Sequence, residues 1–204
     1  SSITKTIKLA LENEVEIGAH PSYTDKENFG RISQYSDEKK LFDDVYKQIK
    51  NFKKLCFKNS ADFKYVKPHG ALYNMASVDD KIAEVIVLAI KKIDPDLKLY
   101  GPSKMNWKNI SDKHHIRYVS EVFSDRNYNE NLTLVDRNKK NSMITDINIS
   151  IDHLSRMIND GKVKTINNKL IDIDIETICI HGDQPNAQLF AKTIHNTFKS
   201  KILK

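Results

Sequence analysis

The sequence has few of the cysteines that cross-link small domains and none of the long apolar runs that anchor chains in membranes. Its 204 residues include two cysteines, Cys56 and Cys179, which are far apart and outside any Cys-x-x-Cys pair. A disulfide framework or zinc knuckle is therefore not expected, and a reducing compartment is predicted. No run approaches the roughly 18 apolar residues of a membrane span, and the first residues lack a signal-peptide pattern. We expect a soluble, cytoplasmic protein that does not contact a membrane.

Several motifs with a known chemistry are also missing. The sequence contains no G-x-x-x-x-G-K-[ST], no G-x-G-x-x-G, no G-x-S-x-G and no H-E-x-x-H. The residue types left for catalysis are histidine, lysine and carboxylate, without an obvious covalent nucleophile.

The charge is modestly basic. Lysine and arginine number 33 against 27 aspartates and glutamates, which gives a net charge of +6. The surplus is mostly lysine dispersed along predicted helices, with no basic stripe interleaved with aromatics, so nucleic-acid binding is not expected. With 39% hydrophobic residues, the length suits one domain spanning residues 1–204.

Helical and extended patterns alternate along the chain. Helical spacing of apolar residues predicts helices over 3–11, 41–55, 77–93, 105–110, 146–158 and 189–198. Short apolar runs predict strands over 15–17, 65–66, 97–100, 116–123 and 177–180, and residues 170–175 alternate like an edge strand with solvated carboxylates. This order favours an α/β fold with a parallel sheet and helical crossovers. Five central strands suit an open sheet better than a closed barrel.

Three histidines follow strand-like runs beside glycine or proline, which is typical of an active-site rim. His20 precedes a turn that leads to Arg31, whose guanidinium could hold a carboxylate or phosphate. Lys67 and His69 share a predicted loop that runs to Tyr73 and Asn74, where a cation could polarise a carbonyl and an imidazole transfer a proton. Each segment can also be read as a structural turn.

The other two candidate segments follow later strands. Glu121 is a candidate base at a strand end, whereas Asp125 and Arg126 could be a surface ion pair. His181 precedes Asp183, which fits an N-cap of the last helix and an anion site there. The irregular stretch 124–144, which contains Arg137, has the charged residues expected of a lid.

On these residues, the chain resembles the LamB/YcsF family, which supplies the A subunit of ATP-dependent 5-oxoprolinase. The matching segments, in the family's order, are 17–23, 29–31, 66–74, 121–126, 134–137 and 178–183. The resemblance implies a distorted, incomplete (β/α) barrel of the polysaccharide-deacetylase-like superfamily. It also implies hydrolysis of the lactam 5-oxo-L-proline to L-glutamate with cleavage of ATP, bound with Mg²⁺, in a complex with 5-oxoprolinase subunits B and C.

The residues and the resemblance together define two candidate sets. The catalytic candidates are His20, Lys67, His69, Glu121, Asp125 and His181. The substrate-binding candidates are Arg31, Tyr73, Asn74, Arg126, Arg137 and Asp183. No metal ligand is assigned.

Two segments typical of the family are not found in the chain. Family members begin with an acidic strand and a second segment that contains Gly-Phe-His, and Ser1 aligns just after them, so an N-terminally truncated family domain is expected. Two alternatives stay open. One is a metal-dependent deacetylase-like hydrolase with histidine and carboxylate ligands. The other is an inactive remnant that only binds its partner proteins.

Overall fold

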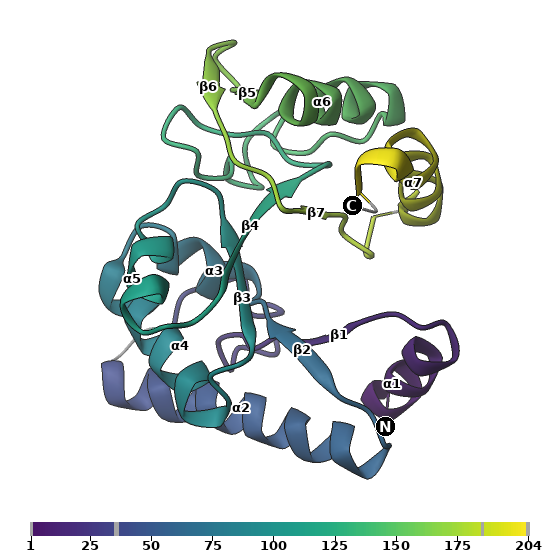
Figure 1. Cartoon of the computed structure of the whole chain (residues 1–204). Helices are drawn as coiled ribbons and strands as arrows, with labels where there is room; N and C mark the ends of the chain where they lie inside the picture. The colour runs from purple at the N-terminus through teal and green to yellow at the C-terminus, as the bar shows by residue number, and fades with distance from the viewer. Residues whose placement is uncertain (1, 35–36, 185, 203–204) are drawn as a thin grey trace. The chain divides into compact units, whose positions relative to one another are not determined.

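The computed structural model describes residues 2–34, 37–184 and 186–202 of the chain (Figure 1). Contacts divide the chain into two compact units. The first comprises Ser1–Gly101 and Met105–Val119, and the second comprises Pro102–Lys104 and Ser120–Lys204. That one domain spans residues 1–204 stays a prediction.

Helices and strands alternate along most of the chain as predicted, except that α3 is followed by α4 and that β5, β6 and β7 are consecutive. The helices are α1 (Ser2–Glu12), α2 (Glu38–Lys58), α3 (Gly70–Ala76), α4 (Asp80–Ile93), α5 (Trp107–Lys113), α6 (Ile147–Asp160) and α7 (Ala187–Ile202). The strands are β1 (Ile17–Ala19), β2 (Phe63–Val66), β3 (Lys98–Pro102), β4 (Tyr118–Phe123), β5 (Lys162–Lys164), β6 (Leu170–Asp172) and β7 (Thr177–Cys179).

Five strands form one sheet in the order β1-β2-β3-β4-β7. The pairs β1–β2, β2–β3 and β4–β7 are parallel. Strands β1 and β7 end the order in the described part of the chain, so the sheet is open. The predicted α/β class with mostly parallel strands in an incomplete barrel is confirmed.

One local prediction is wrong and another holds only in part. Residues 70–74 are not a loop, because Gly70–Ala76 form helix α3 after His69 in extended conformation. The predicted edge strand over 170–175 stops at Asp172 and pairs with β5, which periodicity did not predict. Strand β5 was not predicted because it has only three residues, which is too short to show an alternating pattern.

The first unit is built around the pair of helices α2 and α4 (Figure 1). Val45 and Ile49 of α2 and Ile86 of α4 are fully buried. In the sequence, residues 36–39 resemble a helix capping box, of which Ser36 lies outside the described residues. Helix α2 is capped by Asp37, whose carboxylate accepts a hydrogen bond of 2.8 Å from the backbone N–H of Lys40.

Helix α6 of the second unit has the ends that the sequence indicates. The Asp146 carboxylate accepts hydrogen bonds from the first backbone N–H groups, and Gly161 ends the helix in left-handed conformation at φ 61°. Leu154 and Met157 of α6 are fully buried, and α6 also packs against α7. These contacts form the apolar centre of the second unit.

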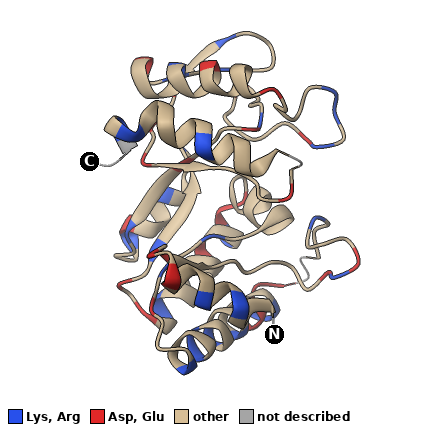
Figure 2. Ribbon diagram, turned by 90° about the vertical axis from the view of Figure 1, so that its right-hand side faces the viewer, with Lys and Arg blue, Asp and Glu red and all other residues tan. Residues whose placement is uncertain are grey.

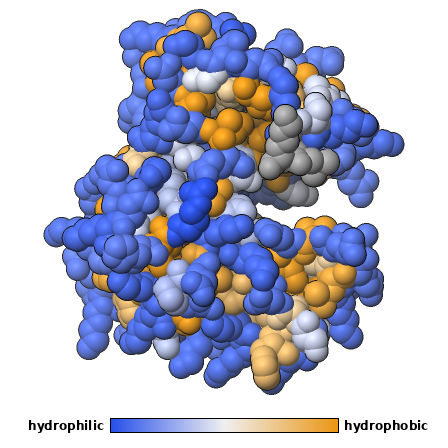
Figure 3. All heavy atoms as spheres, viewed as in Figure 1, coloured by the Kyte–Doolittle hydropathy of each residue, from blue (hydrophilic) through white to orange (hydrophobic). Residues whose placement is uncertain are grey.

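The surface is polar and mixed in charge. Figure 2 shows lysine and arginine spread over the helices with carboxylates between them. Exposed apolar residues gather on and beside α1, at the lower right of Figure 3, where Ile3, Leu9 and Val15 are 44%, 49% and 59% exposed. Among the helices that the structure describes, none is both long and apolar enough to cross a membrane.

His153 is a buried imidazole on helix α6. It is 8% exposed, its ring centroid lies 6.0 Å from that of Tyr128, and its Nε2 has no hydrogen-bond partner in the described part of the chain. Burial lowers the pKa of His153 to about 4, although a hydrogen bond to the backbone of Arg126 acts in the opposite direction. The folded protein therefore holds this ring neutral at pH 7.

We expect His153 to make the protein less stable in mild acid. Since the unfolded chain takes up the proton at its ordinary pKa and the folded chain does not, stability falls as pH drops from about 6.5 to about 4, by about 3 kcal/mol in all. Urea unfolding at several pH values should show a shallower decline for His153→Phe than for the parent protein. The control His195→Phe, at an exposed position of α7, should keep the parent slope, and equal slopes in all three proteins would contradict the assignment.

Candidate functional site

The first cluster of candidate residues lies just beyond strands β1 and β2. His20 follows β1, and Lys67 and His69 follow β2. Parallel pairing continues past the strand ends, because the Lys67 N–H donates to the Ala19 carbonyl at 2.9 Å and the His69 N–H donates to the Pro21 carbonyl at 2.8 Å. These backbone bonds bring together two segments that are far apart in the sequence.

His20 and His69 contact each other directly. Nε2 of His20 lies 3.1 Å from Nδ1 of His69, and the two rings meet edge to face with centroids 4.9 Å apart. The outer nitrogens reach backbone carbonyls: Nδ1 of His20 lies 2.5 Å from the Lys67 oxygen, and Nε2 of His69 lies 2.9 Å from the Phe29 oxygen. All four ring nitrogens are thus engaged.

Two glycines let the segment before Arg31 approach β2 closely. Gly70 has φ 56°, and a Cβ built on it would lie 2.6 Å from the Gly30 carbonyl oxygen. That oxygen also accepts a hydrogen bond of 3.0 Å from the Ala71 N–H. Gly30 itself has φ 66°, and its N–H donates to the Asp25 carbonyl at 2.7 Å. Both positions therefore favour glycine.

Asp25 is a site residue that the sequence reasoning missed. It is 6% exposed, and Oδ1 accepts hydrogen bonds from the backbone N–H and the side-chain amide of Asn28. Its Oδ2 is buried and has no hydrogen-bond partner in the described part of the chain. Asp25 lines a cavity of about 480 Å³ together with His20, Phe29 and His69. The available signal was the Asp-x-x-Asn turn between His20 and Gly30.

The remaining candidates of the first unit differ in placement. Lys67 is half-buried, and its backbone carbonyl is the acceptor for His20. Arg31 is exposed, with its guanidinium carbon 5.4 Å from the centroid of the Phe29 ring. Tyr73 is buried in α3 against Trp107, with ring centroids 5.8 Å apart, whereas Asn74 is exposed. Tyr73 is thus placed in the apolar interior.

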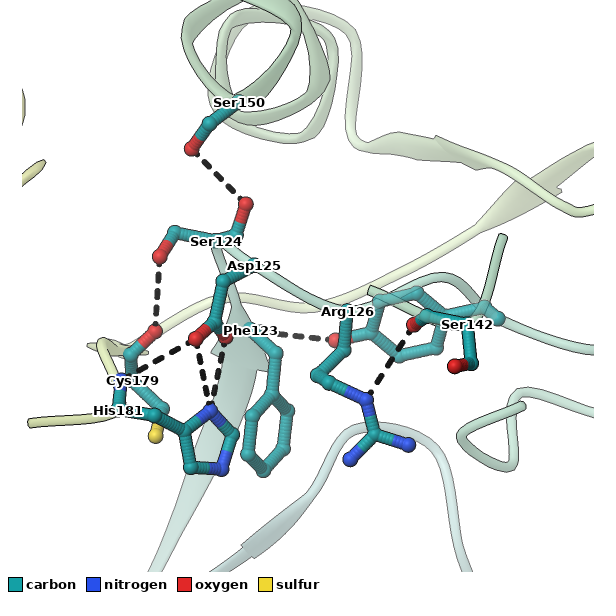
Figure 4. Close-up of polar contacts among 9 residues, drawn as sticks. Phe123, Ser124, Asp125, Arg126, Ser142, Ser150, Cys179 and His181 are labelled. Carbon is teal, nitrogen blue, oxygen red and sulfur yellow. Dashed lines mark hydrogen bonds and ion pairs between the residues drawn. The ribbon is translucent and has the colours of Figure 1, made fainter. Parts of the chain in front are cut away.

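The second cluster follows strands β4 and β7. Asp125 is fully buried, and both carboxylate oxygens lie 2.9 Å from Nδ1 of His181 (Figure 4). The His181 N–H also donates to Oδ2 of Asp125 at 3.3 Å. The carboxylate fixes the proton on Nδ1, so Nε2 carries the lone pair, and Nε2 has no hydrogen-bond partner in the part of the chain that the structure describes. This is the arrangement of an oriented general base.

Neighbouring hydrogen bonds hold Asp125 in place. The Ser124 N–H and hydroxyl both donate to the Cys179 carbonyl at 3.1 Å, and the Ser150 hydroxyl donates to the Ser124 carbonyl at 2.8 Å (Figure 4). The Phe123 ring stacks on His181, with centroids 5.6 Å apart. The carboxylate is therefore positioned by β4, β7 and α6 at once.

Glu121 is not at a strand end as predicted, because β4 continues to Phe123. It is 3% exposed and pairs in register with Thr177. Burial, and to a smaller extent the charge of Glu121, raise the pKa of Tyr128, whose hydroxyl accepts a hydrogen bond of 2.8 Å from the Phe123 N–H. Tyr128 is therefore a neutral structural group.

The surface ion pair considered for Asp125 and Arg126 is not what the structure shows. Arg126 is 3% exposed, and its guanidinium donates to the carbonyls of Val135 at 2.5 Å and Ser142 at 3.4 Å. Burial is the main reason why the pKa of Arg126 falls to about 10. Arg126 therefore ties the stretch predicted as a lid into a fixed loop, while Arg137 on that loop is exposed.

Asp183 is exposed, and it does not cap the last helix. Helix α7 begins at Ala187, four residues further on, so the predicted N-cap is wrong. Within residues 2–34, 37–184 and 186–202, no three histidine, cysteine, aspartate or glutamate side chains are grouped to hold a metal ion. The catalytic and binding roles of the two candidate sets stay predictions.

Comparisons of the sequence and of the structure identify the family of the chain. The LamB/YcsF family model matches residues 1–204. The chain belongs to the LamB/YcsF family. This LamB/YcsF chain is 38% identical over 201 residues to a Histophilus somni protein named as the A subunit of 5-oxoprolinase, a match that covers 98% of the chain and 81% of that protein. It is 36% identical over 200 residues to a Bacillus cereus protein of the same name, covering 98% and 79%.

A solved structure agrees with this assignment. The lactam utilization protein from Thermus thermophilus matches the LamB/YcsF chain with a TM-score of 0.88 and 31% sequence identity, over 97% of this chain and 79% of that one. The family resemblance of the sequence segments is confirmed, and so is the fold class.

We expect Gly70→Ala to destabilise the protein. A methyl group there meets the Gly30 carbonyl and requires a left-handed backbone for alanine, which together should lower the free energy of unfolding by about 1–3 kcal/mol. Urea unfolding measures the change. Gly182→Ala is the matched control, because no atom lies within 4 Å of a Cβ built on Gly182. Equal stability of both variants would refute the close approach.

We also expect Arg126→Met to loosen the loop over residues 124–144. Loss of the guanidinium leaves the buried Val135 carbonyl without this donor, which should cost about 1–3 kcal/mol. Hydrogen exchange should become faster for the amide protons of Asn127 and Val135, which bond across the loop. Arg137→Met, at an exposed position, should leave exchange unchanged, and unchanged exchange in both variants would argue against the clamp.

Proposed function

We propose that this chain acts as the A subunit of an ATP-dependent 5-oxoprolinase, which hydrolyses 5-oxo-L-proline to L-glutamate. The names of its relatives, which refer to 5-oxoprolinase and to lactam utilization, support the proposal. The observation that carries it is the His181 imidazole held by the fully buried carboxylate of Asp125. The substrate class is a cyclic amide.

Opening a lactam needs a group that removes a proton from the attacking water. In the proposed reaction, Nε2 of His181 accepts that proton as the water oxygen attacks the ring carbonyl. Asp125 accepts the Nδ1 hydrogen bond throughout, which keeps Nε2 in the basic form and stabilises the imidazolium that results. The carbon–nitrogen bond then breaks, and the ring nitrogen takes the proton from the His181 imidazolium to become the amine of glutamate.

An amide resists hydrolysis, so the proposed reaction is coupled to cleavage of ATP. Transfer of the γ-phosphoryl group of bound ATP, with Mg²⁺, to the carbonyl oxygen would release ADP and make the carbonyl carbon more electrophilic. Water attack and loss of the ring nitrogen would then leave an acyl phosphate, which a second water would hydrolyse to the carboxylate and inorganic phosphate. The exposed guanidinium groups of Arg31 and Arg137 are the proposed contacts for anionic groups. Arg126, engaged with backbone carbonyls, is proposed to position the loop that carries Arg137.

The names of the relatives imply a multi-component enzyme, and we propose that this chain works with 5-oxoprolinase subunits B and C. The proposal is tested with the protein expressed from its complete gene and combined with B and C. Glutamate release from 5-oxoproline should require ATP and all three proteins. Absence of turnover in the complete mixture would overturn the proposal.

In that assay we expect Asp125→Asn and His181→Gln each to lower kcat by about 10²–10⁴-fold. His181→Gln removes the base, and Asp125→Asn removes the carboxylate that orients it. The control His195→Gln, on the exposed face of α7, should retain parent activity. Circular dichroism and unfolding curves confirm that the variants fold. Full activity of a folded His181→Gln protein would remove His181 from the mechanism.

A further inference from the structure

The hydrogen bonds of the His20–His69 pair fix how many protons it holds. A carbonyl oxygen only accepts hydrogen bonds, so the nitrogen facing each carbonyl must carry a hydrogen. Nδ1 of His20 therefore bears a proton directed at the Lys67 oxygen, and Nε2 of His69 bears one directed at the Phe29 oxygen. Each neutral imidazole has one proton on its ring nitrogens, so these two bonds account for both.

The contact between the rings then needs a third proton. With two neutral rings, Nε2 of His20 and Nδ1 of His69 would face each other at 3.1 Å with a lone pair on each atom, which is repulsive. A proton between them turns the contact into a charge-assisted hydrogen bond. We propose that His20 and His69 share one extra proton, so that the pair carries a single positive charge and serves as the proton donor to a small ligand in the adjoining cavity.

The surroundings of the pair favour this charge. The buried Asp25 carboxylate lines the same cavity of about 480 Å³, and an opposite charge favours the protonated form. Lys26, on the same cavity wall, and Arg31, beside Phe29, oppose it, but both are exposed and screened by solvent. The other titratable groups that line the cavities reached by His20 are Glu16, Tyr23 and Tyr65.

The geometry also gives the route of the proton. Phe29 and His69 line the same cavity, so in the proposed exchange a ligand atom with a lone pair takes the place of the Phe29 carbonyl at Nε2 of His69. His69 gives its Nε2 proton to that atom, and its Nδ1 takes the shared proton from Nε2 of His20. Both rings end neutral, and Nδ1 of His69 donates to Nε2 of His20, so the contact between the rings remains a hydrogen bond.

The ligand class follows from the proton donor. A small molecule that takes up the His69 proton needs an atom with a lone pair at Nε2 of His69, and the carbonyl oxygen of an amide is such an atom. The inference rests on the proposed function for this point alone: under that function, the acceptor is an atom of the lactam amide. The extra proton itself does not depend on it.

Nitrogen NMR of the histidine rings counts the protons directly. In the ligand-free protein at neutral pH, we expect three ring protons on the His20–His69 pair. Two should be static, on Nδ1 of His20 and Nε2 of His69, and the third shared across the inner contact. Two protons on the four nitrogens would overturn the inference. The measurement needs neither substrate nor subunits B and C. If three protons are found but 5-oxoproline is not turned over, the proposed function is refuted and the inference about the histidine pair stands.

Two variants of His69 test the partnership. His69→Phe removes the inner acceptor, so His20 should lose its extra proton at a pH about one unit lower than in the parent protein. His69→Asn supplies an amide oxygen in place of Nδ1, so His20 should lose its extra proton at a pH between those of the parent protein and His69→Phe. His195→Gln should have no effect. Equal titration of His20 in the parent protein and in both His69 variants would contradict proton sharing. If His69→Phe does not fold, the comparison of the parent with His69→Asn and the proton count still decide.

Discussion

Parallel strand pairing that continues beyond the strand ends is the constraint on which both clusters depend. The register of β1 with β2 ends at Ala19 opposite Val66, and the next backbone bonds carry His20 to the residues after β2. The register of β4 with β7 ends at Phe123 opposite Cys179, and the next backbone bond, from the Ser124 N–H to the Cys179 carbonyl, brings the following residues Asp125 and His181 together. Backbone hydrogen bonds therefore bring the two segments of each cluster together, whatever side chains they carry.

The two clusters use imidazole in different ways. His181 has one nitrogen fixed by a buried carboxylate, which leaves the lone pair on the other and suits a base. His20 and His69 have all four nitrogens engaged, two of them by carbonyls, which suits a pair that stores a proton and releases it when one bond is exchanged. The same residue type is thus suited to different tasks because its hydrogen-bond partners differ.

Much of the fold was readable because local signals agreed with the tertiary structure. Asp146 and Gly161 bound helix α6 as their side-chain chemistry indicates, and the five strands of the sheet follow apolar runs. The errors share a cause. Helix α3 begins directly after Pro68-His69, a pattern typical of a turn, and its position depends on the Gly30 carbonyl, which lies far earlier in the chain. Arg126 looks like a surface cation because nothing nearby in sequence shows the carbonyls that bury it.

The sequence by itself determined the α/β class, the family and the histidine, lysine and carboxylate chemistry, because periodicity and short motifs are local properties. Only the tertiary structure decided that His20 pairs with His69 and that Asp125 orients His181, since these partners lie 49 and 56 residues apart. It also revealed Asp25, whose carboxylate matters because it is buried and lines the same cavity as the two imidazoles. Protonation depends on which atoms surround a ring, and folding alone brings those atoms together.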